Sequence, residues 1–197
     1  DSEKAEKLGN VLSVEKLIDA VDLVIETASP SAARQLVPLV LAAHKEIFVM
    51  STGGLLGIPL QKGIYIPAGA IAGLDGVLSA AQSDIRAITL TTKKPPKALG
   101  LDNITSDTIV FEGGVEEAVK AFPKNINVCA TLALVSKKQE LIKVKIIASP
   151  ALKRNTHQVD LEGDFGHIMC RTENEPAPNN PKTSYLAVLS AISAIEK

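Results

Sequence analysis

The sequence is poor in several features that common functional classes require. Aromatic residues occupy 3% of the 197 positions, tryptophan is absent, and there are two cysteines. Lys and Arg number 21 against 22 Asp and Glu, so the chain lacks the basic excess that favours binding to nucleic acid or to an anionic membrane. The longest apolar run, Leu36 to Ala43, is far shorter than the ~20 residues that span a bilayer. We therefore expect no nucleic acid and no membrane among its partners.

The two cysteines, Cys129 and Cys170, show neither metal-ligand spacing nor an obvious disulfide pairing. We expect two reduced thiols in the core of a cytoplasmic protein, and no metal site.

What the chain does have, in its first third, is an alternation of short apolar runs with one helical segment. The runs Val21–Glu26, Ile47–Met50 and Ile64–Ile66 each end in turn residues, as buried strands do. Apolar residues recur at helical spacing from Ala33 to His44, and Pro38 is predicted to kink that helix. This order is typical of a parallel sheet with crossover helices.

The usual opening of a doubly wound nucleotide-binding fold is missing from this pattern. The first strand of such a sheet is central, whereas Val21–Ile25 behaves like a fourth strand, and no glycine-rich strand-to-helix turn precedes it. A long unpaired apolar edge is unfavourable. We therefore expect the first two strands to lie before Asp1, leaving a gap beside Val21–Ile25.

The later part of the chain has an α+β pattern. Two helices, Val115–Phe122 and Asn127–Val135, are predicted between groups of strands, and Gly163–Gly166 predicts a hairpin between the last two strands. The predicted strands are Ile85–Thr92, Thr108–Phe111, Ile142–Ala148, Thr156–Leu161 and Ile168–Thr172. The predicted fold class is α/β: a partial Rossmann-type parallel sheet, followed by a mostly antiparallel sheet that helices cover on one face.

This pattern predicts two domains with a boundary near Pro67–Gly73. Residues 1–68 would be the remainder of a Rossmann-type NAD(P)-binding domain, and residues 69–182 an α+β catalytic and dimerisation domain. A last helix, expected from about Thr183 to the end, would pack back on the first domain.

Ligands of an open parallel sheet bind outside the carboxyl ends of its strands. Small residues follow the predicted strands there and allow close approach of a sugar or a planar ring. They are Ala28, Ser29, Ser51, Thr52 and Ala70. Ordinary turn formation explains each of these residues equally well when it is taken alone.

Asn127 and His157 each have a structural and a functional interpretation. Asn127 opens a predicted helix, so it could serve as an N-cap, or its amide could pair with a nicotinamide carboxamide. His157 shares a strand face with Val159 and Leu161, which suits a hydrogen-bonded core histidine as well as a catalyst.

Two clusters of positive charge also have both a functional and a structural interpretation. Lys182, Thr183 and Ser184 open the last predicted helix, where a lysine beside free N–H groups could bind an anion, although capping alone explains the hydroxyls. The Lys93–Lys97 cluster ends a strand and is interpreted as solvated surface. The residues by themselves thus indicate a two-domain α/β protein with a cleft for a nucleotide and a small anion, without specifying a reaction.

Five segments in register resemble the archaeal and thermophile type of L-aspartate dehydrogenase. They are Ala68–Asp75, Thr92–Gly100, Val110–Gly113, Phe122–Val128 and Asn179–Ser184. The resemblance implies an N-terminal Rossmann domain for NAD or NADP, a C-terminal α/β domain that supplies the active site and the dimer contact, and a role in NAD biosynthesis. It places the catalytic histidine at His157 and cofactor contacts at Ala70 and Asn127.

The resemblance also implies hydride transfer from the α-carbon of L-aspartate to nicotinamide, giving iminoaspartate, which hydrolyses to oxaloacetate and ammonia. A histidine near neutrality suits the proton transfers. The substrate brings two carboxylates that need cationic or N–H partners. We expect one at Lys182, Thr183 and Ser184, and the other at Lys124, followed in preference by Lys94 and Arg154.

One segment departs from the family pattern. The family carries a helix between the positions of Thr52 and Ile64, whereas this chain has a short connection. We therefore expect a broken or disordered backbone there. The rival functions are a two-domain dehydrogenase acting on homoserine or dihydrodipicolinate, and a non-catalytic nucleotide-sensing module.

Overall fold

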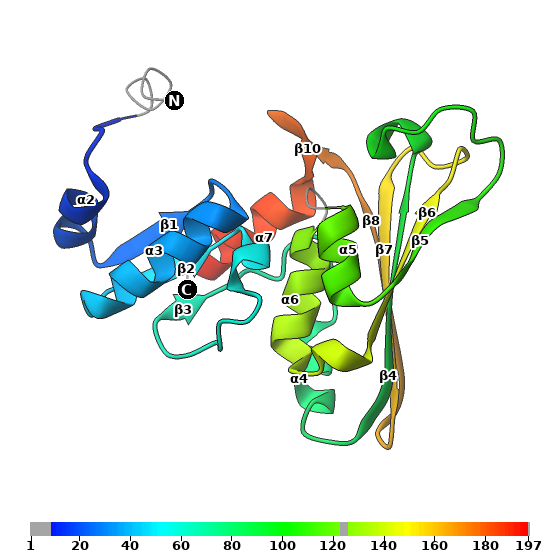
Figure 1. Ribbon diagram of the computed structural model, residues 1–197, viewed down its shortest axis with the longest axis horizontal. Coiled ribbons are helices and arrows are strands. Elements are labelled where there is room, and N and C mark those ends of the chain that lie inside the picture. Colours follow the sequence, from blue (N-terminus) through cyan, green and yellow to red (C-terminus); the bar gives the residue numbers. More distant parts are fainter. Residues whose placement is uncertain (1–8, 123–125, 197) are drawn as a thin grey trace.

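The computed structural model describes residues 9–122 and 126–196, and it contains a small parallel sheet and a larger mixed sheet. The two sheets lie at opposite ends of the molecule, with helices between them (Figure 1). No helix in the described ranges is long and apolar enough to cross a membrane.

The small sheet is parallel, as predicted, with the order β1-β2-β3. Its elements are α2 (Val14–Ala20), β1 (Leu23–Glu26), α3 (Pro30–Ala42), β2 (Glu46–Val49) and β3 (Ile64–Tyr65). Ser29 is the N-cap of helix α3, and its side chain accepts a hydrogen bond from the Ala32 N–H. Pro30 lies in the first turn of the helix, and Pro38 lies inside it. Among the described strands, β1 pairs with β2 alone and so forms an edge of the sheet.

The connection between Thr52 and Ile64 is continuous, so the expected break in the backbone was wrong. A short 3-10 helix, η1 (Thr52–Leu55), is separated from β2 by two residues. The Ile58 N–H then bonds to the Leu55 carbonyl at 2.8 Å. Leu55 is fully buried in the core beside α3. The tight turns and the buried side chain of Leu55 hold the short connection between β2 and β3 in place, so a longer helix is not needed to span it.

The larger sheet has the order β5-β6-β4-β7-β8, in which β4 and β6 are parallel and the other pairs are antiparallel. Its strands are β4 (Ile85–Lys94), β5 (Thr108–Gly113), β6 (Ile142–Ala148), β7 (Asn155–Gly163) and β8 (Gly166–Asn174). The hairpin predicted at Gly163–Gly166 is confirmed as the β7–β8 turn. Strand β4 runs two residues further than predicted, which brings Lys93 and Lys94 into the sheet.

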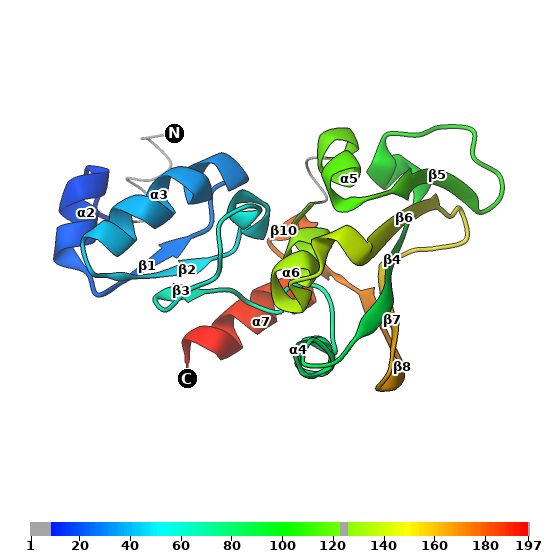
Figure 2. The ribbon, with the colours of Figure 1, turned by 60° about the horizontal axis from the view of Figure 1, so that its bottom comes forward.

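Helices cover one face of this sheet in both views (Figures 1 and 2). They are α4 (Leu74–Ala80), α5 (Val115–Ala121) and α6 (Ile126–Ser136), with short 3-10 turns η2 (Pro96–Leu99) and η4 (Gln139–Leu141) beside the strands. Helix α6 is apolar all round because it is buried from several sides: it contacts η1, α4 and α5, and Ala130 and Leu132 have no exposed surface. It therefore links the cores of the two sheets.

The end of the chain differs from the prediction. Residues Asn180–Ser184 form strand β10, which pairs with β9 (Pro176–Ala177), and helix α7 (Tyr185–Ile195) begins only after them. The pairing with β9 and the bond from the Tyr185 N–H to the Glu175 carbonyl at 2.8 Å hold the extended backbone that the sequence pattern assigned to a helix. Helix α7 lies beside the small sheet in both views, and the Gly69 N–H donates to Ser190 Oγ at 3.0 Å.

Candidate active site

Glu26 organises the carboxyl ends of β1 and β2, where the sequence predicted a cofactor. Its side chain is 2% exposed, and one oxygen accepts from the N–H groups of Ala28 at 2.7 Å and Ser29 at 2.9 Å. The other oxygen accepts from the Ser51 N–H at 3.0 Å. Three N–H donors offset the cost of burying a carboxylate. The sequence reasoning missed Glu26, whose signal was an acidic residue at the end of a buried apolar strand.

Thr52 and Asn127 join this edge to the start of α6. The Thr52 hydroxyl donates to the Asn127 carbonyl at 2.9 Å and lies 2.9 Å from the Thr131 hydroxyl, while the Asn127 side-chain oxygen accepts from the Gly53 N–H at 3.2 Å. Asn127 lies one residue inside α6, so the N-cap interpretation was wrong. Its side chain is exposed, and no described residue accepts from its amide nitrogen, which leaves that group to donate to a ligand.

Ala70 is fixed to the larger sheet by its carbonyl group. Its oxygen accepts from Thr172 Oγ1 at 2.8 Å and from Asn174 Nδ2 at 3.0 Å, both at the end of β8. These two bonds use both lone pairs of the carbonyl oxygen. The segment that leaves β3 is therefore held against the strand that lies beside β7.

His157 lies on β7 opposite Thr92 of β4 and Thr172 of β8. Its ring Nδ1 is 3.0 Å from the Thr92 hydroxyl, and its side chain is 5% exposed. Burial and then the charge of Lys94 lower the pKa of His157 to about 4, so the imidazole is neutral at pH 7. His157 shares the helix-facing side of the sheet with Val159 and Leu161, as the sequence indicated.

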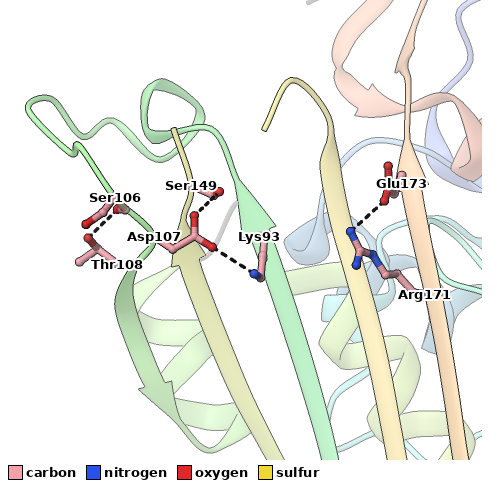
Figure 3. Close-up of polar contacts among 7 residues, drawn as sticks. All are labelled: Lys93, Ser106, Asp107, Thr108, Ser149, Arg171 and Glu173. Atoms are coloured by element: carbon pink, nitrogen blue, oxygen red, sulfur yellow. Dashed lines mark hydrogen bonds and ion pairs between the residues drawn. The ribbon is translucent and has the colours of Figure 1, made fainter. Parts of the chain in front are cut away.

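Lys94 and Lys93 point to opposite faces of β4. Lys94 lines a small cavity between the sheet and helices α5 and α6, and burial lowers its pKa. Thr92 lines the same cavity two residues earlier on the strand. Lys93 lies on the other face, where it pairs with Asp107 at 3.1 Å and Asp107 also bonds Ser149 (Figure 3). The interpretation of this cluster as solvated surface was therefore wrong for Lys94.

The remaining predicted substrate residues are placed less directly. Thr183 Oγ1 accepts from Asn180 Nδ2 at 3.0 Å within β10, and Ser184 is the N-cap of α7, although its side chain caps no N–H. Lys182 lies on β10 rather than at a helix start, and its side chain is not described. Lys124 lies outside the described residues. Arg154 pairs with Glu175.

The described ranges also place the potential metal ligands and the two thiols. No group of three or more His, Cys, Asp or Glu side chains there is arranged to hold a metal ion. Neither cysteine forms a disulfide, and burial raises the pKa of Cys129 to about 11, so its thiol stays protonated.

Comparison with known proteins identifies the family. Residues 75–197 match the family "Aspartate dehydrogenase, C-terminal", and residues 2–62 match "Homoserine dehydrogenase, NAD binding domain". The L-aspartate dehydrogenase of Methanosarcina barkeri is 46% identical, with 94% of this chain and 77% of that protein covered. The enzyme of Methanothermobacter thermautotrophicus is 41% identical, with 100% and 82% covered.

A solved structure agrees with these sequence matches. The crystal structure of aspartate dehydrogenase from Thermotoga maritima superposes with a TM-score of 0.73 at 30% identity, over 95% of this chain and 79% of that one. The chain therefore belongs to the L-aspartate dehydrogenase family.

Proposed function

We propose that this chain oxidises the α-carbon of L-aspartate with NAD or NADP, and that His157 is its catalytic residue. The observation that supports this role is the environment of the His157 imidazole, which is neutral, buried and in contact with the Thr92 hydroxyl. His157 lies on β7, next to strand β8, whose Thr172 anchors Ala70. The family resemblance seen in the sequence implies a catalytic histidine at this position. A role in NAD biosynthesis follows from the same resemblance.

The residues at the strand ends fit a nicotinamide cofactor. Glu26 fixes the backbone at Ala28, Ser29 and Ser51, which gives a rigid edge of small residues where a dinucleotide approaches an open parallel sheet. In this proposal those residues, with Thr52, Ala70 and the exposed amide of Asn127, hold the cofactor. When bound, the nicotinamide ring accepts the hydride from the substrate.

His157 would act on protons rather than on the hydride. The α-amine must be neutral when its carbon loses a hydride, and the product iminoaspartate must then be hydrolysed. A neutral imidazole can accept a proton from the amine or from the attacking water. Burial makes His157 a weaker base than the near-neutral histidine that the sequence led us to expect. Thr92 holds Nδ1, which leaves Nε2 for the substrate and fixes the direction of the ring.

Lys94 is the best-supported partner for a substrate carboxylate. It shares its strand face with Thr92, and its charge acts on His157. Arg154 is instead committed to Glu175. The side chains of Lys182 and Lys124 remain candidates from the sequence, together with the backbone and hydroxyls of Thr183 and Ser184.

We also propose the domain organisation and assembly that the sequence predicted. Residues 1–68 would form the cofactor domain and residues 69–182 the catalytic domain, with the last helix packed on the first. In the views of Figures 1 and 2 no described helix covers the second face of the larger sheet, which supports a homodimer formed through that face. The cytoplasmic location expected from the composition is part of the same proposal.

The test is an absorbance assay for reduced cofactor with L-aspartate, with homoserine, and with neither substrate, for both NAD and NADP. We expect L-aspartate alone to give a signal, and His157→Ala to lower turnover by about 10²–10⁴-fold with cofactor affinity nearly unchanged. Turnover of homoserine in place of aspartate would contradict the proposed substrate. Full activity in His157→Ala would instead favour the core-histidine interpretation.

A further inference from the structure

Asn174, at the end of β8, has a buried side-chain oxygen without a hydrogen-bond partner in the described part of the chain. The residue is 3% exposed, and its Nδ2 donates to the Ala70 carbonyl at 3.0 Å and to Thr172 Oγ1 at 3.1 Å. Because a carbonyl oxygen can only accept, the Ala70 contact fixes which side-chain atom is nitrogen. Oδ1 is then a buried acceptor with no donor. Such atoms are rare in folded proteins and call for a ligand, water or functional explanation.

The position of this oxygen relates it to the proposed active site. Asn174 follows Thr172 on the same face of β8, and Thr172 lies directly opposite His157. Both side chains bond Ala70. An acceptor therefore lies one strand away from the proposed catalytic imidazole, on the side of the sheet that faces the helices.

Two charged groups in the proposed active site, Glu26 and Lys94, bear on which donor this acceptor would meet. The fully buried carboxylate among the described residues is Glu26, and both of its oxygens already accept backbone N–H groups. Burial and the positive charge of Lys94 lower the pKa of His157. Low exposure and the charge of Lys94 therefore disfavour an additional positive charge beside His157.

We propose that Asn174 Oδ1 accepts a hydrogen bond from the α-amino group of L-aspartate, an inference that rests on the proposed function. Oxidation removes a hydride from Cα and one proton from the amine, and the nitrogen lone pair becomes the second bond of the C=N group. The amine must be neutral for this to happen. An amide oxygen orients the amine without the strong preference for ammonium that a carboxylate would impose.

The first experiment separates this bond from the anchoring of Ala70. Asn174→Ala removes both functions of the side chain, whereas Thr172→Val removes one anchor of the Ala70 carbonyl and leaves Oδ1 in place. Succinate has both carboxylates of aspartate and no amine. We expect the KM for L-aspartate to rise roughly 3- to 10-fold more in Asn174→Ala than in Thr172→Val. The inhibition constant of succinate should be equal in the two variants.

The second experiment uses the isosteric change Asn174→Asp, which places a carboxylate beside the amine. We expect it to favour ammonium and to shift the limb of kcat/KM that reports the substrate amine to higher pH, by about one unit. Succinate-induced thermal stabilisation of each variant, which needs no turnover, reports whether the site is folded.

Equal effects of Asn174→Ala and Thr172→Val on aspartate would overturn the proposal. So would a loss of succinate binding in Asn174→Ala as large as its loss of aspartate binding. A rise confined to the KM of the cofactor would also overturn it and would assign the oxygen to the nicotinamide amide instead. A wild-type chain that does not oxidise L-aspartate would remove the proposed function itself. If the wild type is active and Asn174→Ala and Thr172→Val affect the KM for L-aspartate equally, only the proposed role of Asn174 is ruled out.

Discussion

Neighbouring residues of one strand lie in different chemical environments on the two faces of the larger sheet. Adjacent lysines at the end of β4 differ in environment because successive side chains of a strand point to opposite sides. Lys93 is paired with Asp107 on the open face, and Lys94 lies near the neutral His157 on the helix-facing side. A partly buried cation near a neutral imidazole suits an anionic substrate.

This contrast gives a matched test of substrate binding. Lys94→Met should raise the KM for L-aspartate about ten- to hundredfold, because a carboxylate loses a charged partner worth roughly 1.5–3 kcal/mol. The KM for the cofactor should change little. Lys94→Arg, which retains the charge, should recover part of the loss, and Lys93→Met should behave like the wild type. Steady-state kinetics of the three variants would exclude this role for Lys94 if the two methionine variants gave the same KM.

At the scale of elements, η1 is the part that brings the two sheets together. It is separated from β2 by two residues, packs against α3, and contacts the start of α6 through Thr52 and Gly53. The close approach depends on Gly54, because a Cβ at this position would lie 2.3 Å from the Pro30 carbonyl oxygen and 2.8 Å from the Ala33 Cβ. A side chain there would push η1 away from the helix.

We therefore expect Gly54→Ala to destabilise the fold by about 1–3 kcal/mol, the usual cost of overpacking. Gly76→Ala is the control: it lies in α4, where the new methyl group meets Ile168 at an ordinary 3.7 Å, and should be neutral or stabilising by up to about 1 kcal/mol. Chemical denaturation of both variants measures the difference. A Gly54→Ala variant as stable as the wild type would show that η1 moves away from α3 without cost.

Across the whole molecule, the larger sheet has one face packed on helices and one face open. The open face carries exposed apolar side chains, including Met169 at 61% and Ile109 at 56%, among ion pairs such as Arg171–Glu173 (Figure 3). Exposed apolar residues mixed with paired charges are common at interfaces between subunits. An interface of this kind should bury more than ~1,000 Å² in total.

If two copies associate through this face, a charge at Met169 should separate them. Met169→Glu should convert a dimer into a monomer in light scattering at micromolar concentration. Leu39→Glu changes a residue of α3 that is 51% exposed, away from the sheet, and should leave the dimer intact. A wild type that is monomeric under these conditions would refute the assembly.

The sequence by itself determined the elements and the family. Apolar periodicity is a local property, so the strands of both sheets and most of their helices, α4 excepted, could be predicted to within a few residues. Five segments in register identified the family, and the catalytic role that they imply for His157 stays a prediction. The tertiary structure decided the partners. Three contacts depend on strand register and on segments that are distant in the sequence. Glu26 accepts hydrogen bonds from three N–H groups, Asn174 donates to Ala70 while its oxygen has no partner among the described residues, and Lys94 lies near His157. The β10 strand was missed for the same reason, because its extended backbone depends on pairing with β9 rather than on its own residues.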